Sequence, residues 1–245
     1  MQFSFSHNFS QLGHYISMIH DGNIGFKANY AKKITLGNRQ QISKKRGFDA
    51  ESVVALQQAH TNNIFIAHFE DGGAGSLDWE SGIADADGLI TNTKGITLLV
   101  QSADCPLVLL FDPLTNVLGV VHSGWRGTVQ GIIPEAVRQM QNTFNVLIEN
   151  VYVGITPCAG SCCYDIGMDV TDKFLALFPE NVVIRKNDKK FLDLKTAINY
   201  QLFEAGVSSN HIETNSICTI CDLNFYSYRR EKDHSGRFGL FAWLI

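Results

Sequence analysis

The sequence lacks the long apolar run that a membrane helix requires. No stretch of its 245 residues approaches the ~18 consecutive apolar residues of a membrane span, although 45% of the residues are hydrophobic. The opening residues, MQFSFSHNFS, contain neither a positively charged segment nor an apolar core, so no secretory signal is predicted. We therefore expect no membrane association and a cytoplasmic location.

Positive charge and cysteine are also scarce. The chain has 20 Lys and Arg against 24 Asp and Glu, a formal charge of -4, and no basic cluster that resembles a phosphate-binding stripe. This balance argues against nucleic acid as a partner. Six cysteines in a chain of this length do not indicate a disulfide scaffold, so we interpret them as reduced thiols.

Several cofactor motifs are absent. The sequence has no GxxxxGK[ST] loop and no GxGxxG turn, which excludes nucleotide binding by those routes. Its eight histidines form no His-x-His pair, so a conventional trinuclear copper cluster with a blue-copper site cannot be assembled. No internal repeat or linker is present, and we predict a single domain over residues 1–245.

The rest of the chain is organised around residues 100–128. Residues 107–111 and 117–121 are β-branched and aliphatic runs, which are typical of buried strands. Asp112 and Pro113 lie between them and fit the first two positions of a type I turn, because proline presets φ and aspartate bonds the backbone ahead of it. The pattern predicts a tight hairpin.

The hairpin brings two reactive side chains together. If Phe111 faces Val117, the same register places Cys105 within one residue of facing His122. A thiol and an imidazole at neighbouring strand ends can share a metal ion or a proton. His60 sits at a break between two further predicted strands, where its side chain can point into a cleft.

These three residues form the best candidate site. The two imidazoles and the thiolate of His60, Cys105 and His122, with an open fourth position, make a catalytic zinc set. Zinc at such a site lowers the pKa of bound water toward ~7. Asp104 is a candidate base or acceptor for a ligand N–H, and Arg126 a candidate for holding a phosphate or carboxylate.

Four other signals in the sequence compete with this interpretation. Without a metal, Cys105 and His122 form a thiolate–imidazole nucleophile pair. HIE at 211–213 and CTIC at 218–221 imitate a zinc deaminase signature, but four intervening residues cannot accommodate its two helices. Cys162 and Cys163 with the CTIC cysteines are a candidate structural zinc site, although we prefer to interpret them as buried thiols beside strands. Asp85 and Asp87 alone are a weak Ca²⁺ signal.

Strands and helices alternate irregularly, which favours a mixed α/β (α+β) sandwich over a doubly wound parallel sheet. Further strands are predicted at 52–57, 64–68, 151–155, 224–228 and 238–244. Helices are predicted at 38–47 with Asn38 as the cap, after Thr128 to about residue 144, after Asp169, and after Asp193.

Six short motifs carry a family resemblance. They are QAH at 58–60, ADGLIT at 86–91, SADC at 102–105, HSGWRG at 122–127, CCYDIG at 162–167 and FYSYRRE at 225–231. In this order they resemble the laccase-domain (YfiH-like) family, also called the multicopper polyphenol oxidoreductase or purine nucleoside phosphorylase family. The match spans residues 50–245; before it, HDGN at 20–23 stands where members commonly carry a Ser/Thr-Arg-Gly-Gly-like stretch.

The resemblance implies a fold, ligands and substrates. The fold would be the α/β sandwich shared with certain toxin-like cysteine hydrolases, and His60, Cys105 and His122 would be zinc ligands. Members are described as phosphorylases of adenosine, inosine and methylthioadenosine that also deaminate adenosine. Others are described as copper-binding polyphenol oxidases, or as amidases that edit peptidoglycan precursors.

We accordingly expect a small-molecule enzyme, with nucleoside and phosphate as ligands and the oligomeric state open. Arg126, Arg229 and Arg230 are candidates for the anion pocket, and Tyr164 is expected to line the cleft. A non-enzymatic domain with a structural metal is the contrasting alternative. A three-ligand site with an open position argues against it, because structural zinc is usually closed by four protein ligands.

Overall fold

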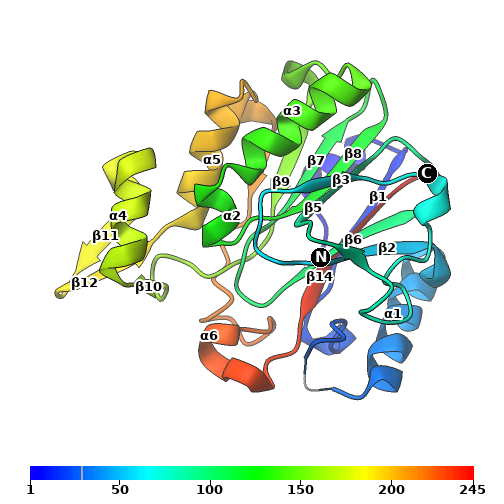
Figure 1. Ribbon diagram of the computed structural model, residues 1–245, viewed down its shortest axis with the longest axis horizontal. Helices are drawn as coiled ribbons and strands as arrows, with labels where there is room; N and C mark the ends of the chain where they lie inside the picture. Colours follow the sequence, from blue (N-terminus) through cyan, green and yellow to red (C-terminus); the bar gives the residue numbers. More distant parts are fainter. Residues whose placement is uncertain (29) are drawn as a thin grey trace.

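The computed structural model describes residues 1–28 and 30–245. Two large β-sheets lie face to face, and helices cover their outer faces (Figure 1). This arrangement is the mixed α/β sandwich predicted above. No helix in the described ranges is long and apolar enough to cross a membrane.

The first large sheet has five strands in the order β1-β14-β6-β2-β4. They are β1 (Leu12–Ile16), β14 (Phe238–Leu244), β6 (Thr97–Ser102), β2 (Val53–Gln57) and β4 (Ile83–Ala84). Strand β14 pairs antiparallel with both β1 and β6, whereas β2 runs parallel to β6 and β4. One of the last segments of the chain therefore lies inside this sheet.

The second large sheet has six strands in the order β13-β9-β7-β8-β5-β3. They are β13 (Ile212–Thr214), β9 (Tyr152–Ile155), β7 (Leu107–Asp112), β8 (Val117–His122), β5 (Gly88–Thr91) and β3 (Ile64–Ile66). Its three central pairings are antiparallel and its two edge pairings are parallel.

The inner strands of each large sheet, such as β6, β7 and β8, are buried on both faces, which is why they are continuous apolar runs instead of alternating ones. The main core lies between the sheets, where Val54 and Leu98 of the first belong to one cluster with Leu109 of the second. Helix α1 (Lys32–Arg46) covers the outer face of the first sheet with Ile42. Helix α3 (Ile132–Phe144) and helix α5 (Leu194–Glu204) cover the outer face of the second.

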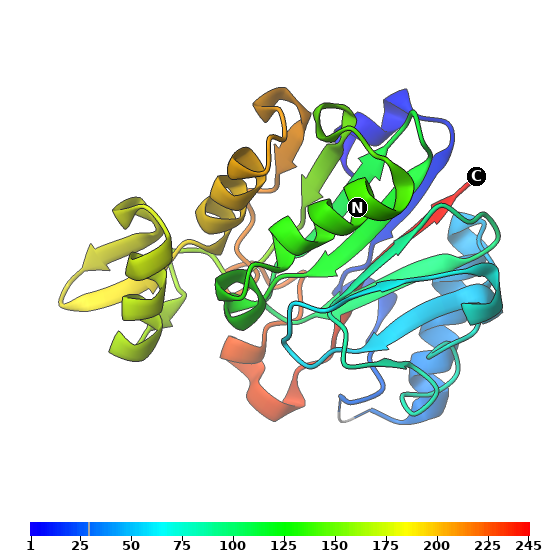
Figure 2. The same cartoon turned by 45° about the horizontal axis from the view of Figure 1, so that its top comes forward.

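A third, small sheet projects to one side of the sandwich (Figure 2). It contains β10 (Asp165–Ile166), β12 (Lys189–Leu192) and β11 (Val183–Lys186), with α4 (Met168–Leu177) packed beside it. Phe174 of α4 and Leu192 of β12 share an apolar cluster there. Its first strand, β10, lies inside the CCYDIG segment at 162–167, so the projection begins beside the candidate site.

The predicted hairpin is present as β7 and β8, but its register differs by one residue. As predicted, Asp112 organises the turn: its carboxylate accepts hydrogen bonds from Leu114 N at 2.9 Å and Thr115 Oγ1 at 2.6 Å. Phe111 pairs with Leu118, not with Val117. The turn is closed by residue 116 in a left-handed conformation (φ 54°), so Asp112 joins the strand and shifts the pairing.

Two helix starts differ from the prediction. Helix α1 begins at Lys32, so Asn38 is not its cap; the Asn38 side chain lies mid-helix and donates to the carbonyl of Asn23 at 2.8 Å. Gly47 ends α1 as predicted, in the left-handed conformation (φ 79°). Thr128 does not cap a helix. It lies inside the short α2 (Trp125–Val129), and its hydroxyl donates to the carbonyl oxygens of Ser123 and Gly124.

The remaining differences lie in the second half of the chain. Gly167 is the N-cap of α4, and Asp169 lies in its first turn instead. Asp193 caps α5 as predicted, accepting a hydrogen bond from Thr196 N at 3.1 Å. Residues 224–228 are not a strand; they lead into the short α6 (Tyr228–Glu231).

Candidate active site

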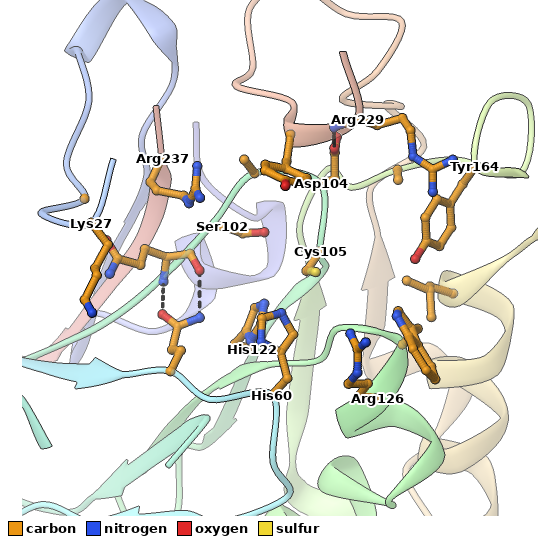
Figure 3. A pocket seen from close by; sticks show the side chains of 18 of the residues that line it. Lys27, His60, Ser102, Asp104, Cys105, His122, Arg126, Tyr164, Arg229 and Arg237 are labelled. Carbon is orange, nitrogen blue, oxygen red and sulfur yellow. Dashed lines mark hydrogen bonds between the residues drawn. The ribbon is translucent and has the colours of Figure 1, made fainter. Parts of the chain in front are cut away.

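A cavity of about 770 Å³ opens where the loop after β2, the segment before β7, α2 and α6 meet (Figure 3). His60 and Cys105 come from the first two of these elements, and His122 ends β8. All three line the cavity, and one side-chain atom of each lies within 4.8 Å of the others. The structure thus brings the predicted trio together from three distant parts of the chain.

Asp87 holds His122 in place. The buried imidazole and carboxylate are joined by a 2.8 Å contact between His122 Nδ1 and Asp87 Oδ1. Asp87 Oδ2 also accepts hydrogen bonds from Ala59 N at 3.0 Å and from Thr61 N at 2.8 Å. Burial opposes its charge, but the contacts with His122 and these amides lower the pKa of Asp87 to about 2. The carboxylate is therefore an acceptor, and Nδ1 carries the proton.

The same neighbours activate the thiol. Burial alone would raise the pKa of Cys105, but the charges and hydrogen bonds of His122 and His60 lower it to about 6. Burial likewise opposes protonation of His122, but Cys105 and Asp87 raise its pKa to about 9. The pair therefore favours a thiolate beside an imidazolium at neutral pH.

Two residues at the trio have unusual backbone conformations. His60 has φ 62° and Asp104 has φ 92°, left-handed conformations that side-chain-bearing residues rarely adopt. Gly124 faces the trio, and a Cβ atom added there would lie 2.9 Å from Cys105 Sγ and 3.4 Å from His60 Cδ2. Glycine at this position leaves room for the three donor groups.

Asp104 lies next to the trio, but its carboxylate is engaged elsewhere. Oδ1 accepts a hydrogen bond from Thr219 Oγ1 at 2.7 Å, and Oδ2 accepts from Ser227 Oγ at 3.1 Å and from Arg229 N at 2.6 Å. These bonds attach the segment before β7 to the loop before α6. The geometry supports a positioning role for Asp104 more directly than the predicted role as a base.

The cavity wall is rich in cations. Arg126 and Arg229, both predicted, line it, and so do Lys27 and Arg237, which sequence reasoning missed. The guanidinium of Arg126 lies 4.4 Å from the ring centre of Trp125, and that of Arg229 lies 5.0 Å from the ring centre of Tyr164. Asp104 is the only carboxylate among the described residues of the lining, so the cavity is suited to an anion.

Arg230 corrects the predicted anion pocket. It does not line the cavity. Its guanidinium instead donates to the carbonyl oxygens of Thr219, Ile220 and Phe225 at 2.7 to 3.0 Å and pairs with Glu231. Because these groups satisfy its donors, Arg230 braces the loop before α6.

Two polar atoms at the cavity have no partner within the described structure. Ser102 Oγ and Gln101 Oε1 are buried and form no hydrogen bond, although both residues line the cavity. Unpaired buried polar atoms cost free energy of folding. The backbone of Gln101 is held by two 2.8 Å hydrogen bonds with the side chain of Gln58, drawn as dashed lines in Figure 3.

Comparison with known proteins decides the family. The model of the family described as multi-copper polyphenol oxidoreductase laccase matches residues 8–245 of the chain. The chain belongs to this family. The match includes most of the first fifty residues, to which the motif resemblance did not extend and where HDGN at 20–23 departs from the usual family stretch.

Relatives of this laccase-domain chain carry enzyme names. A purine nucleoside phosphorylase, YlmD, of Geobacillus stearothermophilus is 30% identical over 220 residues, which are 88% of this chain and 80% of the relative. An adenosine deaminase from an unknown prokaryotic organism is 28% identical over 207 residues, which are 82% of this chain and 79% of the relative. These names support an enzyme with a small-molecule substrate.

Solved structures confirm the fold. The crystal structure of YlmD from Geobacillus stearothermophilus has a TM-score of 0.92 and 28% identity, covering 96% of this chain and 93% of that one. The crystal structure of a YfiH protein from Bacillus licheniformis has a TM-score of 0.88 and 28% identity, covering 91% and 85%.

The trio of this laccase-domain chain fits a metal by its donor chemistry. It offers two imidazoles and one activated thiol at mutual distances within 4.8 Å, and these groups face the cavity. Because Asp87 takes the Nδ1 proton of His122, Nε2 is the nitrogen that can bind a metal ion once the imidazolium has lost its other proton. Sequence reasoning missed this role of Asp87, although the residue belongs to the ADGLIT motif.

Proposed function

We propose that this enzyme is a zinc-dependent purine nucleoside phosphorylase that also deaminates adenosine. The observation that carries the proposal is the meeting of a His-Cys-His donor set with a cationic, aromatic-walled cavity. The relatives named for these two activities support it. His60, Cys105 and His122 would hold the zinc ion, which when bound supplies a Lewis acid and lowers the pKa of a water ligand.

The cations of the cavity would bind phosphate. Arg126 and Arg229 stand on one wall, on α2 and α6, while Lys27 and Arg237 stand on the other (Figure 3). Guanidinium groups bind phosphate oxygens in a bidentate manner. The Asp104 carboxylate is occupied by other donors. Arg229, however, already pairs with the Asp165 carboxylate, so Arg126 is the stronger of the two candidates for phosphate.

The aromatic side of the cavity would bind the base. Trp125 and Tyr164 line it, each with an arginine over its ring, and flat rings of this kind stack on a purine. Burial raises the pKa of Tyr164, so its hydroxyl stays protonated and can donate a hydrogen bond to the base.

In phosphorolysis, a phosphate oxygen bonds to C1′ of the ribose while the C1′–N9 bond breaks. The electron pair of that bond leaves with the purine, which takes up a proton, and the second product is ribose 1-phosphate. In deamination, the oxygen of water bonds to C6 of adenine and the amino group leaves as ammonia. Both reactions act on one bound nucleoside, which one cavity can hold in two reactive positions.

The test is a paired assay on the purified enzyme. Inosine with phosphate should yield hypoxanthine and ribose 1-phosphate, and adenosine without phosphate should yield inosine and ammonia, each followed by chromatography. His122→Ala should lower both rates by at least about a hundredfold, because it removes a donor of the proposed site. Arg138→Met, an exposed arginine paired with Glu135, is the control and should match the wild type.

Turnover of neither nucleoside by zinc-loaded enzyme would overturn the proposal. The same preparation should also be given a phenol with copper and a muramyl peptide. Activity on either of these, without nucleoside turnover, would assign the site to oxidation or to amide hydrolysis instead.

A further inference from the structure

A second group of thiols lies outside the trio. The sulfur atoms of Cys162, Cys163, Cys218 and Cys221 all lie within 4.8 Å of one another. Cys163 Sγ is 3.1 Å from Cys221 Sγ, and Cys162 Sγ is 3.7 Å from Cys221 Sγ. We call these four residues the thiol cluster. It joins the loop after β9 to the loop after β13.

The thiol cluster is not hydrophobic packing, which corrects our sequence interpretation. Cys162 and Cys221 are exposed, and Cys163 and Cys218 are half-buried. Cys158, only four residues before Cys162, is the buried thiol that the interpretation describes. Surface thiols gain little from burial, so their convergence from two loops needs another cause.

The geometry points to a structural zinc site with four thiolate ligands. With Zn–S bonds of about 2.3 Å, a tetrahedral site separates its sulfur atoms by about 3.8 Å. The two sulfur–sulfur distances of 3.1 and 3.7 Å and the upper limit of 4.8 Å bracket that value. Four protein ligands leave no open position, so the ion would be structural.

The backbone is arranged to receive thiolate charge. Gly160 N donates to Cys218 Sγ at 3.2 Å, and the amides of Ile220 and Cys221 also face this sulfur. Amides two and three residues after a cysteine that point at its sulfur are what a Cys-x-x-Cys turn needs to hold a metal.

Two cationic side chains lie beside the thiol cluster. The Arg230 guanidinium donates to the carbonyl oxygens of Thr219 and Ile220, inside the Cys218–Cys221 turn. Lys195 Nζ donates to the carbonyl of Ile217, just before it, at 2.9 Å. A single Zn²⁺ with four thiolates carries two negative charges. Lys195 offsets part of this charge, whereas the Arg230 guanidinium is shared with the Glu231 carboxylate.

The ion would fasten one wall of the cavity. Tyr164 directly follows Cys163, and Arg229 is held by Asp165 through a hydrogen bond of 2.5 Å. On the other loop, Thr219 bonds Asp104. Zinc in the thiol cluster therefore crosslinks the two segments that position Tyr164 and Arg229, without itself touching the substrate.

Metal analysis of matched variants tests the inference, and it is independent of the proposed function. Wild-type enzyme purified with zinc should hold two ions per chain, one for each group. Cys162→Ser/Cys221→Ser should lose one ion, Cys105→Ala should lose the other, and the combined variant should hold none. Cys158→Ala, which alters a neighbouring thiol outside the cluster, should keep both.

Cobalt substitution distinguishes the ligands. In the Cys105→Ala background, added Co²⁺ should give the strong thiolate-to-cobalt charge-transfer absorption of a tetrahedral four-sulfur site. This readout works on a chain with an intact thiol cluster, so it does not depend on the folding of the serine variant.

The inference fails if Cys162→Ser/Cys221→Ser retains the zinc content of the wild type, or if Co²⁺ gives no such absorption. It also fails if mass spectrometry of freshly purified, alkylated protein shows Cys163 and Cys221 joined in a disulfide. If the ion is present, removing it from the Cys105→Ala variant with a chelator should speed amide exchange in residues 158–167 and 217–229. Unchanged exchange would contradict the crosslinking role.

Discussion

His122 donates its Nδ1 hydrogen to Asp87, a residue that is fully buried and keeps its negative charge. The second oxygen of Asp87 is fixed by the backbone of Ala59 and Thr61, on either side of His60. The Asp87 carboxylate therefore orients the His122 imidazole directly. It also fixes the loop that carries His60, because it accepts hydrogen bonds from the backbone amides on either side of that residue.

Replacing the Asp87 carboxylate should lower the affinity of the trio for zinc while the shape of the site stays the same. Asp87→Asn keeps the shape but offers His122 a weaker acceptor, so zinc affinity should fall by about 10- to 100-fold. Competition with a chromogenic chelator measures it. The matched control is Asp85→Asn, an exposed aspartate two residues away, and its affinity should equal that of the wild type. Equal affinities for all three proteins would show that Asp87 does not orient the metal ligand.

Gly124 should tolerate no side chain. A Cβ atom there would lie 2.9 Å from Cys105 Sγ, so Gly124→Ala should push the sulfur away and reduce zinc at the trio by at least about tenfold in affinity. Gly37→Ala is the control: nothing lies within 4 Å of its added methyl group, and alanine should stabilise helix α1 by about 0.5–1 kcal/mol. Normal zinc binding by Gly124→Ala would contradict the geometry of the trio.

Arg126 should act on phosphate more than on the nucleoside. Arg126→Met removes a guanidinium from the cavity, and the KM for phosphate in phosphorolysis should rise by about 10- to 100-fold, the usual effect of losing one charged hydrogen-bonding group. The KM for adenosine in deamination, measured without phosphate, should change less. If both KM values rise together, Arg126 binds the nucleoside and not the anion.

His14 should make the free energy of unfolding depend on pH. Its Nε2 accepts a hydrogen bond from Phe3 N at 2.7 Å, so the folded chain needs the neutral imidazole. Burial lowers the pKa of His14 from 6.5 to about 4. Because the unfolded chain takes up this proton first, the contribution to stability is complete above pH 6.5 and is lost as pH falls toward 4. It amounts to about 3 kcal/mol.

Urea unfolding between pH 7 and pH 4, with a chelator in every sample to remove metal effects, measures this loss. His14→Gln keeps an acceptor for Phe3 N but does not titrate, so its stability should fall less steeply over the same range. Parallel curves for the two proteins would exclude His14 as the source.

Local chemistry accounts for what the sequence could predict. The Asp-Pro turn and the apolar runs beside it identified β7 and β8, and Asp193 and Gly47 marked helix ends through their side-chain and backbone preferences. Helix α1 was predicted to start too late because Ala31 precedes it and makes no side-chain cap. The register of the hairpin depends on the left-handed conformation of Asn116, and this conformation could not be predicted from the local sequence.

The site depends on longer-range relations. The trio could be named from family motifs, but spacing alone gave no reason to join His60 to Cys105. Asp87 pairs with a residue 35 positions away, and Lys27 and Arg237 reach the cavity from opposite ends of the chain. These contacts join residues that are far apart in the sequence and follow no periodic pattern. They could therefore be found only in the three-dimensional structure.

The place of β14 has a consequence for biosynthesis. Residues 238–244 are the only link between β1 and β6 in the described sheet, since they bond to both. On the ribosome, the first strand must wait for almost the whole chain before its neighbour emerges, and such non-local pairing is slow. Until then β1 and β6 expose unpaired edges, so the nascent chain is open to aggregation and to chaperone binding at those two strands.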